Sequence, residues 1–433
     1  MRGKTEKMRR ALMRSNTRRL LSAVALLEFL AMLLVALQPG EGTLQPWLLT
    51  LAIPLCTILV TNLMGKIWPV DRAILILTLL LCGVGLIALS DICKSESTPR
   101  TQAIYAAAGV AAMFIGAAIV RGLSNWKRIT PVLMALCLLA LLSPWAIGRW
   151  QNGARNWIVF GPSEAPYFSL QPSEFMKPVL IAVLASCFSN RPRFVRCLPG
   201  IGFAALCCAV LLTERDLGAV LLYFLTTVLM YYAATSNAAL SLAGLGMGAG
   251  AAVIAYNAFP YVQDRVAIWQ NPWSDPLDAG YQIVRALAAI GSGGLFGMGM
   301  GQGRQKFAYL PYPESDFIFA IVGEDFGLIG CLTVIALFVL FVLAGLRVSL
   351  ACRDRFGCLL GTGITSMIGL QAFINMGVVT GILPTTGLPL PFFSAGGTSV
   401  SMIMAAVGIL LSISRENGAQ IVEASDRQRE GRA

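Results

Sequence analysis

Long apolar runs, separated by short polar segments, follow one another along the whole chain. A helix needs about 20 apolar residues to cross the hydrocarbon core of a bilayer. Twelve runs approach that length, so the pattern predicts an all-α fold, a polytopic helical membrane bundle of about twelve transmembrane helices. The shortest run follows Pro172, and only residues 214–216 separate two others. The predicted spans are 20–38, 47–65, 72–92, 102–121, 130–147, 172–189, 197–213, 217–233, 238–257, 316–345, 357–380 and 397–414.

The composition supports a membrane protein. Hydrophobic side chains make up 56% of the 433 residues and charged ones only 13%, whereas a soluble domain carries about 25% charged residues. The mean hydropathy is +0.71. These values exclude a disordered chain, a secreted disulfide scaffold and a nucleic-acid-binding domain as the main interpretation.

The basic residues indicate the orientation of the helices. The net charge is +11, with 33 Lys and Arg against 22 Asp and Glu. If the N-terminus is cytoplasmic, the segments on that side hold 23 of the 33 basic residues, as the positive-inside bias requires. We therefore expect both termini in the cytoplasm, in a multi-pass protein of the cytoplasmic membrane, and no binding of nucleic acid.

This orientation divides the chain into segments and points to the outer face. We expect a basic cytoplasmic N-terminus at 1–19, two helices within 20–70, a main membrane domain at 71–414 and a disordered cytoplasmic tail at 415–433. A large outer loop at 258–315 and shorter outer segments at 148–171 and 381–396 carry most of the unusual polar content. Because the cytoplasmic loops are short and basic, function is expected at the outer face.

The available side chains limit the chemistry. The chain has no histidine, which removes the commonest general base, a His-ligated metal site and a Ser-His triad. Eleven cysteines lie mostly inside apolar runs without the paired spacing of a zinc site, so we interpret them as packing residues. The sequence indicates no particular cofactor, and it neither requires nor excludes a divalent cation. Chemistry must rest on carboxylates, lysine and arginine.

The start of the 172–189 span carries two charges. Glu174 and Lys177 are three residues apart and share a helix face, and Glu174 lies near the N-terminus, where the helix dipole favours a negative charge. One interpretation is a capped helix start with an internal ion pair. However, Lys177 lies within the apolar run, where a charge costs about 2.5–3.5 kcal/mol, and is therefore a functional candidate.

Two further charged segments are less easily interpreted. Residues 214–216, Glu-Arg-Asp, are either a solvated outer turn or part of a site. The outer loop contains Arg265 and a glycine-rich stretch at 291–303 that superficially resembles a dinucleotide-binding spacing. We reject that function because no strand precedes it. The glycines instead favour a bent segment that packs close to other backbone.

Asp316 opens the long apolar run 316–345, which also contains Glu324 and Asp325. One interpretation of Asp316 is a helix N-cap. Three carboxylates at the outer end of a membrane helix are nevertheless the best candidates for a base in a chain without histidine. The proline-rich segment 384–394 is either rigid packing or the wall of a groove.

Six collinear motifs resemble the SEDS family of shape, elongation, division and sporulation proteins, typified by FtsW, RodA and SpoVE. The resemblance covers 71–414. Each motif is weak alone, but their order on matching positions of the predicted topology is specific. The motifs are Asn152-Gly153-Ala154 with Trp157, Gln171-Pro172-Ser173-Glu174 with Lys177, Asp216-Leu217-Gly218, Gly280-Tyr281-Gln282, Ser315-Asp316-Phe317 with Gly323-Glu324, and Thr386-Gly387 with Pro391-Phe392 and Ser394.

The resemblance implies ten membrane helices and an enzyme that polymerises lipid II, the undecaprenyl-pyrophosphate-linked disaccharide peptide, into peptidoglycan strands. It also implies a class B penicillin-binding protein as the crosslinking partner. Asp316 matches the catalytic aspartate, Glu174 and Lys177 a charged pair lining the central cavity, and Trp157 a tryptophan of the first outer loop. The first two helices are additional to the family pattern. Asn156 stands where arginine is common, and Arg215 where proline is usual.

We expect an inverting glycosyl transfer at the outer leaflet. Asp316 would act as the general base, and a single base suffices because inversion needs no glycosyl-enzyme intermediate. Lys177, Arg155 and Arg265 would stabilise the pyrophosphate leaving group, and Lys177 near Asp316 would lower the pKa of that carboxyl. The alternative is a lipid II flippase that uses the same charged cavity. The enzyme is favoured because polar content is concentrated toward the outer face. A non-catalytic scaffold would leave Lys177 unexplained.

Overall fold

The computed structural model describes residues 2–38, 44–92, 97–119, 126–151, 154–161, 168–189 and 194–430. Asn152 and Gly153 of the first motif lie outside the described residues, as does Cys93. The helices are α1 (Arg2–Ala36), α2 (Gln45–Ile67), α3 (Arg72–Ile92), α4 (Ser97–Ile119), α5 (Trp126–Ile147), α6 (Pro172–Phe188), α7 (Phe194–Thr213), α8 (Leu217–Thr235), α9 (Ala238–Ala258), α10 (Pro260–Gln270), α11 (Tyr281–Gly293), α12 (Gln305–Ala308), α13 (Ile318–Leu350), α14 (Arg355–Val379) and α15 (Gly397–Glu430), with a 3-10 turn η2 (Pro272–Ser274).

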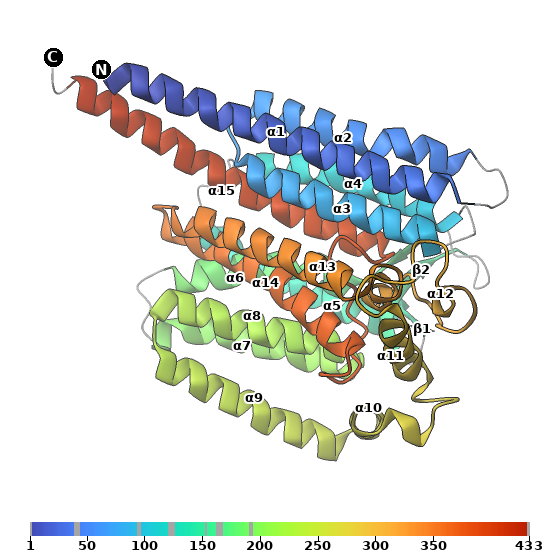
Figure 1. The fold of residues 1–433 in the computed structure, drawn as a ribbon. Coiled ribbons are helices and arrows are strands. Elements are labelled where there is room, and N and C mark those ends of the chain that lie inside the picture. The colour runs from blue at the N-terminus through green and yellow to red at the C-terminus, as the bar shows by residue number, and fades with distance from the viewer. Residues whose placement is uncertain are drawn as a thin grey trace.

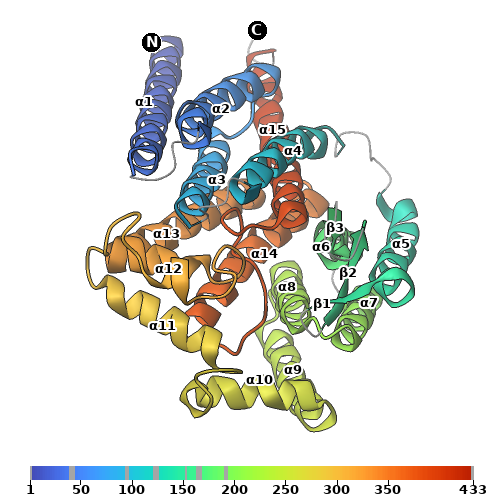
Figure 2. The same ribbon diagram turned by 90° about the vertical axis from the view of Figure 1, so that its right-hand side faces the viewer.

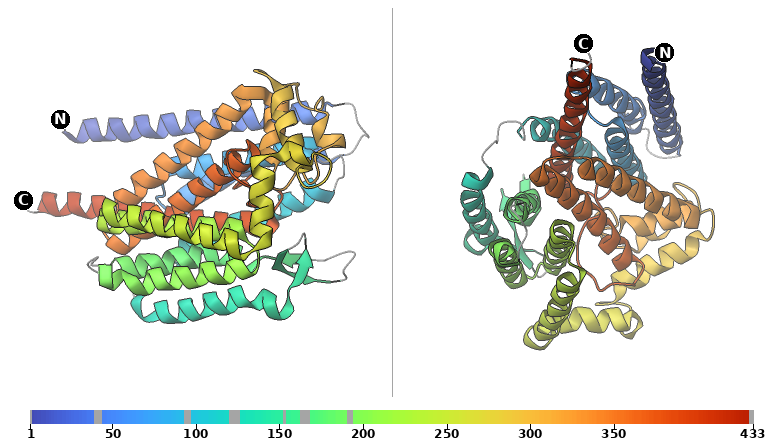
Figure 3. Two further views of the ribbon diagram at one scale, coloured as in Figure 1. Left: turned by 90° about the horizontal axis from the view of Figure 1, so that it is seen from below. Right: turned by 90° about the vertical axis from the view of Figure 1, so that its left-hand side faces the viewer.

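The long helices run side by side as one bundle (Figure 1). The start of α1 and the end of α15 lie at one end of this bundle (Figure 3). The β strands and the short helices α10, α11 and α12 lie at the opposite end, which we call the loop end. Viewed from the loop end, α14 lies near the middle and α1, α5 and α9 lie at the periphery (Figure 2).

Within the described residues, eleven helices are long and apolar enough to cross a membrane, and they correspond to eleven of the twelve predicted spans. The remaining prediction, 172–189, forms α6, which has 17 residues. Helix α6 is short because a strand occupies the chain until Leu170 and the helix begins only at Pro172. At a rise of about 1.5 Å per residue, it is about 26 Å long.

Segment 148–171 contains a small antiparallel sheet that the all-α prediction did not include. Its strands are β1 (Arg149–Gln151), β2 (Ala154–Phe160) and β3 (Phe168–Leu170), in the order β1-β2-β3. Arg149 pairs with Trp157, and Ile158 with Leu170. Aromatic and β-branched residues, which suit a pleated surface, are concentrated in β2, so a signal for a strand was present in the sequence.

The glycine-rich stretch packs against the backbone of α13, as its composition predicts. Gly327 interrupts α13 with a φ of 64°, a conformation that favours glycine. The N–H of Met298 donates to the carbonyl of Glu324 (2.9 Å), and the N–H of Leu328 donates to that of Gly294 (2.9 Å). A Cβ on Gly327 would lie only 2.4 Å from the nitrogen of Gly297. The backbone of this stretch is thus held at the loop end.

Both ends of the described chain are helical. The tail was predicted to be disordered from residue 415, but α15 continues as a helix to Glu430 (Figure 3). The N-terminal helices α1 and α2 pack on α3, where Met32, Ile53 and Ile87 form a small buried cluster. Their apolar contact surfaces explain why the helices join the bundle.

Candidate active site

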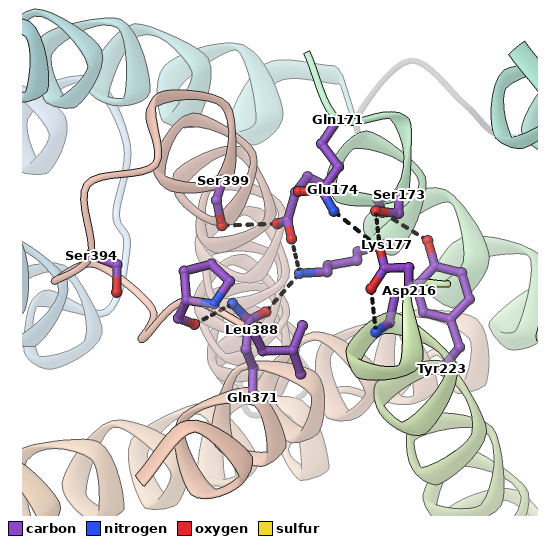
Figure 4. A network of polar contacts seen from close by, with 12 residues as sticks. Gln171, Ser173, Glu174, Lys177, Asp216, Tyr223, Gln371, Leu388, Ser394 and Ser399 are labelled. Atoms are coloured by element: carbon purple, nitrogen blue, oxygen red, sulfur yellow. Dashed lines mark hydrogen bonds and ion pairs between the residues drawn. The ribbon is translucent and has the colours of Figure 1, made fainter. Parts of the chain in front are cut away.

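A buried ion pair lies at the start of α6. Lys177 Nζ is 2.5 Å from Glu174 Oε1, and both side chains are at most 3% exposed. Lys177 also donates to Gln371 Oε1 of α14 (2.9 Å), while Ser399 Oγ of α15 donates to Glu174 Oε2 (2.8 Å) (Figure 4). The predicted ion pair is therefore present, and it joins three helices in the interior of the bundle.

Asp216 is the centre of a second group of polar contacts. Its Oδ2 accepts hydrogen bonds from Asn156 Nδ2 (3.3 Å), Gln171 Nε2 (3.0 Å) and Ser173 Oγ (3.2 Å). Its Oδ1 accepts from the N–H of Ala219 (3.0 Å) and so caps α8. The interpretation of 214–216 as a solvated turn is wrong, because the side chain of Asp216 is buried and connects β2, α6 and α8.

Glu214 lies beside Asp216 and is also buried. Loss of hydration, with a further contribution from the negative charge of Asp216, raises the pKa of Glu214 to about 8. The N–H of Arg155 donates to the carbonyl of Glu214 (3.4 Å), and Arg155 Nε donates to the carbonyl of Gly148 (3.2 Å). Arg155 is thus brought to the acidic turn. Its neighbour in β2, Trp157, is only partly buried.

Asp316 lies in the loop between α12 and α13. Ser315 Oγ is 2.7 Å from Asp316 Oδ1, and Asn375 Nδ2 of α14 donates to the main-chain carbonyl of Asp316 (2.7 Å). Helix α13 begins after Phe317, which has no side-chain cap, so Asp316 is not the helix N-cap. Its carboxylate is partly buried at the loop end of the bundle.

Burial raises the pKa of Asp316, whereas the Ser315 hydrogen bond and the charge of Arg265 oppose that shift. The predicted lowering of this pKa by Lys177 is therefore wrong. The physical reason is that Lys177 is paired with Glu174, and the cation that acts on Asp316 is Arg265. A carboxylate with a raised pKa is a stronger base when ionised, which suits proton abstraction.

Arg265 of α10 interacts electrostatically with both Asp216 and Asp316. Its Nη1 donates to the carbonyl of Thr385 (2.9 Å). Burial lowers the pKa of Arg265, while the charges of Asp216 and Asp316 favour its cationic form. The guanidinium is therefore a cation close to both carboxylates, in a position to balance negative charge that develops during a reaction.

The proline-rich segment 384–394 connects these groups. Gln371 Nε2 donates to the carbonyl of Pro389 (2.9 Å), and Asn375 Nδ2 donates to that of Leu388 (2.8 Å). Because Gln371 and Asn375 are four residues apart on α14, the Lys177 and Asp316 contacts are separated by about 6 Å along that helix. The segment is thus joined to α14 by the same two side chains that contact Lys177 and Asp316.

Gln371 and Asn375 were not singled out as site residues by the sequence, and Asp216 was named only within segment 214–216 and its motif. Gln371 and Asn375 do have a signal, since they are polar residues with a spacing of four in the apolar run 357–380. Among the described residues, no group of three or more Cys, Asp or Glu side chains is arranged to hold a metal ion.

Comparisons with known proteins agree on one family. Residues 68–419 match the FtsW, RodA and SpoVE family model, described as "Cell cycle protein", so α1 and α2 precede the matched region. The chain is similar to stage V sporulation protein E of Bacillus subtilis, with 38% identity over 80% of this chain and 97% of the relative. It is 39% identical to a probable peptidoglycan glycosyltransferase FtsW of Geobacter metallireducens, over 73% of this chain and 84% of the relative.

Two solved structures are similar in fold. A chain from a peptidoglycan synthase complex, described as coordinating polymerization and crosslinking, matches with a TM-score of 0.68 and 26% identity over 80% of this chain and 98% of that chain. The rod shape determining protein RodA of Thermus thermophilus matches with a TM-score of 0.59 and 24% identity, over 80% of this chain and 97% of that chain. The membrane bundle is thus one already seen in this group of proteins.

Proposed function

Because this chain belongs to the FtsW, RodA and SpoVE family and is a peptidoglycan glycosyltransferase by homology, we propose that it polymerises lipid II into glycan strands at the outer face of the cytoplasmic membrane. The loop end of the bundle is the outer end in this proposal, and both termini are cytoplasmic. The 23 basic residues on the proposed cytoplasmic side support this orientation.

The placement of Asp316 carries the proposal. Asp316 is a carboxylate with a raised pKa at the loop end, close to a cation, and its backbone is held by a side chain of the central helix α14. As the general base, Asp316 takes the proton from the acceptor sugar hydroxyl while the oxygen attacks the anomeric carbon of the donor. The glycosidic bond forms as the bond to the pyrophosphate breaks, with inversion at that carbon.

The departing undecaprenyl pyrophosphate develops negative charge, which a fixed cation stabilises. Arg265 is the first candidate because its charge acts on Asp316 directly. Lys177 and Arg155 complete the proposed binding set with Glu174, which orients Lys177. Trp157 is proposed to contact the substrate from strand β2. Apolar helices around this set would contact membrane lipid and hold the polyprenyl chains of the substrate.

We also propose a class B penicillin-binding protein as the crosslinking partner. The similar chain in a peptidoglycan synthase complex supports this proposal, because that complex combines polymerization with crosslinking. The partner would use the strands at the outer face as soon as the membrane domain makes them.

The test is polymerisation of lipid II by the purified full-length chain in detergent, alone and with a class B penicillin-binding protein. Asp316→Ala is compared with wild type and with Glu314→Gln, which removes a nearby carboxylate from the same loop. We expect strands from wild type and Glu314→Gln and none from Asp316→Ala. Strands from a folded Asp316→Ala at the wild-type rate would overturn the proposed base. If no strands form and labelled lipid II instead crosses proteoliposomes, the flippase is supported.

A further inference from the structure

The loop that carries Asp316 is closed at its base by a buried ion cluster. Lys306 in α12 precedes the loop, and Asp325 in α13 follows it. Lys306 Nζ donates to Asp325 Oδ1 (2.7 Å) and Oδ2 (2.9 Å), and it also forms an ion pair with Asp91 of α3. The side chains of all three residues are at most 3% exposed.

Glu324 strengthens the same closure through backbone contacts. Its Oε1 accepts hydrogen bonds from the N–H groups of Arg304 (2.6 Å) and Gln305 (2.9 Å), at the start of α12. Both stems of the loop are thus joined twice, once by the ion pair and once by the Glu324 carboxylate. The residues between them include Asp316, whose position depends on where these stems lie.

The two aspartates of the cluster share one lysine, so their other oxygens need neutral hydrogen-bond donors. Lys306 is the one cation that contacts both Asp91 and Asp325 within this cluster. A buried carboxylate oxygen without a donor is costly. Gln38 Nε2 donates to Asp91 Oδ1 (2.6 Å), and the N–H of Gly301 lies 3.4 Å from Asp91 Oδ2. Gln38 thus completes the cluster.

Gln38 lies two residues after the end of α1 at Ala36, and this helix precedes the region matched by the family model. Helix α1 is held against the bundle at a second level. Glu28 is fully buried and accepts a hydrogen bond from Thr57 Oγ1 (3.2 Å) of α2. Gly83 of α3 permits this close approach, because a Cβ there would be 2.7 Å from Glu28 Oε1. Gln38 is therefore just beyond the end of an anchored helix.

We propose that α1 positions the Asp316 loop, with Gln38 and Lys306 as positioning residues that act through Asp91 and Asp325. This inference rests on the proposed role of Asp316. The amide of Gln38 keeps Asp91 directed at Lys306, and Lys306 keeps α12 fixed to α13. The N-terminal helix thus becomes part of the structure that aligns the base with the acceptor hydroxyl.

The test compares full-length wild type with Gln38→Leu, which keeps similar volume and removes the amide donor. Ser22→Ala is the matched control on α1, because Ser22 Oγ donates only locally to the carbonyl of Arg18 (3.0 Å). Two quantities are measured in detergent: hydrogen–deuterium exchange across the chain, and kcat and KM for lipid II polymerisation. Gln38→Asn, one methylene shorter, provides a milder variant if Gln38→Leu does not fold.

We expect faster exchange at residues 309–317 in the Gln38 variant, with unchanged exchange in α14. We expect kcat to fall between about tenfold and a hundredfold while KM changes little, because misplacement of a reacting group by about 1 Å has effects of this size. Ser22→Ala should match wild type in both measurements.

Two results would overturn the inference. Unchanged exchange at 309–317 in the Gln38 variants would show that α1 does not hold the loop. Faster exchange with an unchanged kcat would show that the loop is held but that its position does not matter for the reaction. A failure of Asp316 as the base is recognised separately, because Asp316→Ala would then remain active while the exchange effect of Gln38→Leu persisted.

Discussion

The side-chain amide of Asn375 donates a 2.7 Å hydrogen bond to the main-chain carbonyl of Asp316. Asn375 therefore holds the backbone of the proposed base and leaves its carboxylate to Ser315 and Arg265. Because the same amide also bonds the carbonyl of Leu388, one residue of α14 aligns the Asp316 loop with the proline-rich segment. The position of the base is thus determined from the centre of the bundle.

Replacement of Asn375 should impair the reaction more than substrate binding. Asn375→Leu removes both hydrogen bonds, so the loop loses its attachment to α14. We expect kcat to fall about tenfold or more with a small change in KM, because reaction rate is more sensitive to alignment than binding is. Polymerisation kinetics with purified lipid II provide the measurement. Thr380→Val, which loses only local bonds to the carbonyls of Met376 and Gly377 in the last turn of α14, is the control and should retain the wild-type kcat.

The acid limb of the pH profile should report Asp316. Burial raises its pKa above the ordinary value of about 3.9, and the reaction needs the ionised form. Activity should therefore begin to fall at a higher pH than for an exposed aspartate as the medium is acidified. Arg265→Gln removes a charge that lowers this pKa, so the acid limb should move to still higher pH.

The measurement is kcat as a function of pH for wild type, Arg265→Gln and Glu314→Gln. Glu314→Gln should leave the acid limb at the same pH as in wild type. If Arg265→Gln shifts the acid limb downward, or leaves it unchanged with reduced activity at all pH values, Arg265 does not act on Asp316 in the way described.

The Glu174–Lys177 pair should be strongly non-additive. Lys177→Met leaves a buried carboxylate without its cation, and losses of this kind cost about 3–5 kcal/mol. Adding Glu174→Gln removes the uncompensated charge, so the double variant should melt at a higher temperature than Lys177→Met alone. Thermal melting of the four proteins in one detergent completes the cycle. Additive losses would mean that the two side chains do not depend on each other.

Much of the bundle is predictable because its determinant is local. The length of an apolar run decides whether a helix can span the bilayer, and eleven predicted spans correspond to such helices in the described part of the chain. Helix α6 is the exception, since the boundary at Pro172 depends on the strand before it. The sheet was missed because its short strands lie within a polar segment read as a loop.

The site is only partly predictable for a related reason. The contact of Glu174 with Lys177 follows from helical spacing. In contrast, Gln371 contacts Lys177 across 194 positions of the sequence. No local pattern indicates this contact, nor that Arg265 rather than Lys177 is the cation that acts on the pKa of Asp316.

Glu214 should make the stability of the protein depend on pH. Its pKa is raised to about 8 in the folded state, so the folded chain retains a proton that the unfolded chain loses near its ordinary value of about 4.3. The folded state binds more protons and is therefore favoured at low pH. The contribution of Glu214 to stability is full below the unfolded pKa of about 4.3. It decreases as the pH rises toward 8.

Glu214→Gln keeps a neutral side chain of similar shape at every pH. Its melting temperature should therefore exceed that of wild type at pH 9, above the folded pKa of about 8, and approach it at pH 5, well below that value. Melting of both proteins in detergent at the two pH values gives the comparison. Asp278→Asn, at an exposed acidic position in the outer loop, is the control and should follow wild type. An equal difference between wild type and Glu214→Gln at both pH values would contradict the raised pKa, because a group that does not titrate in this interval cannot change stability across it.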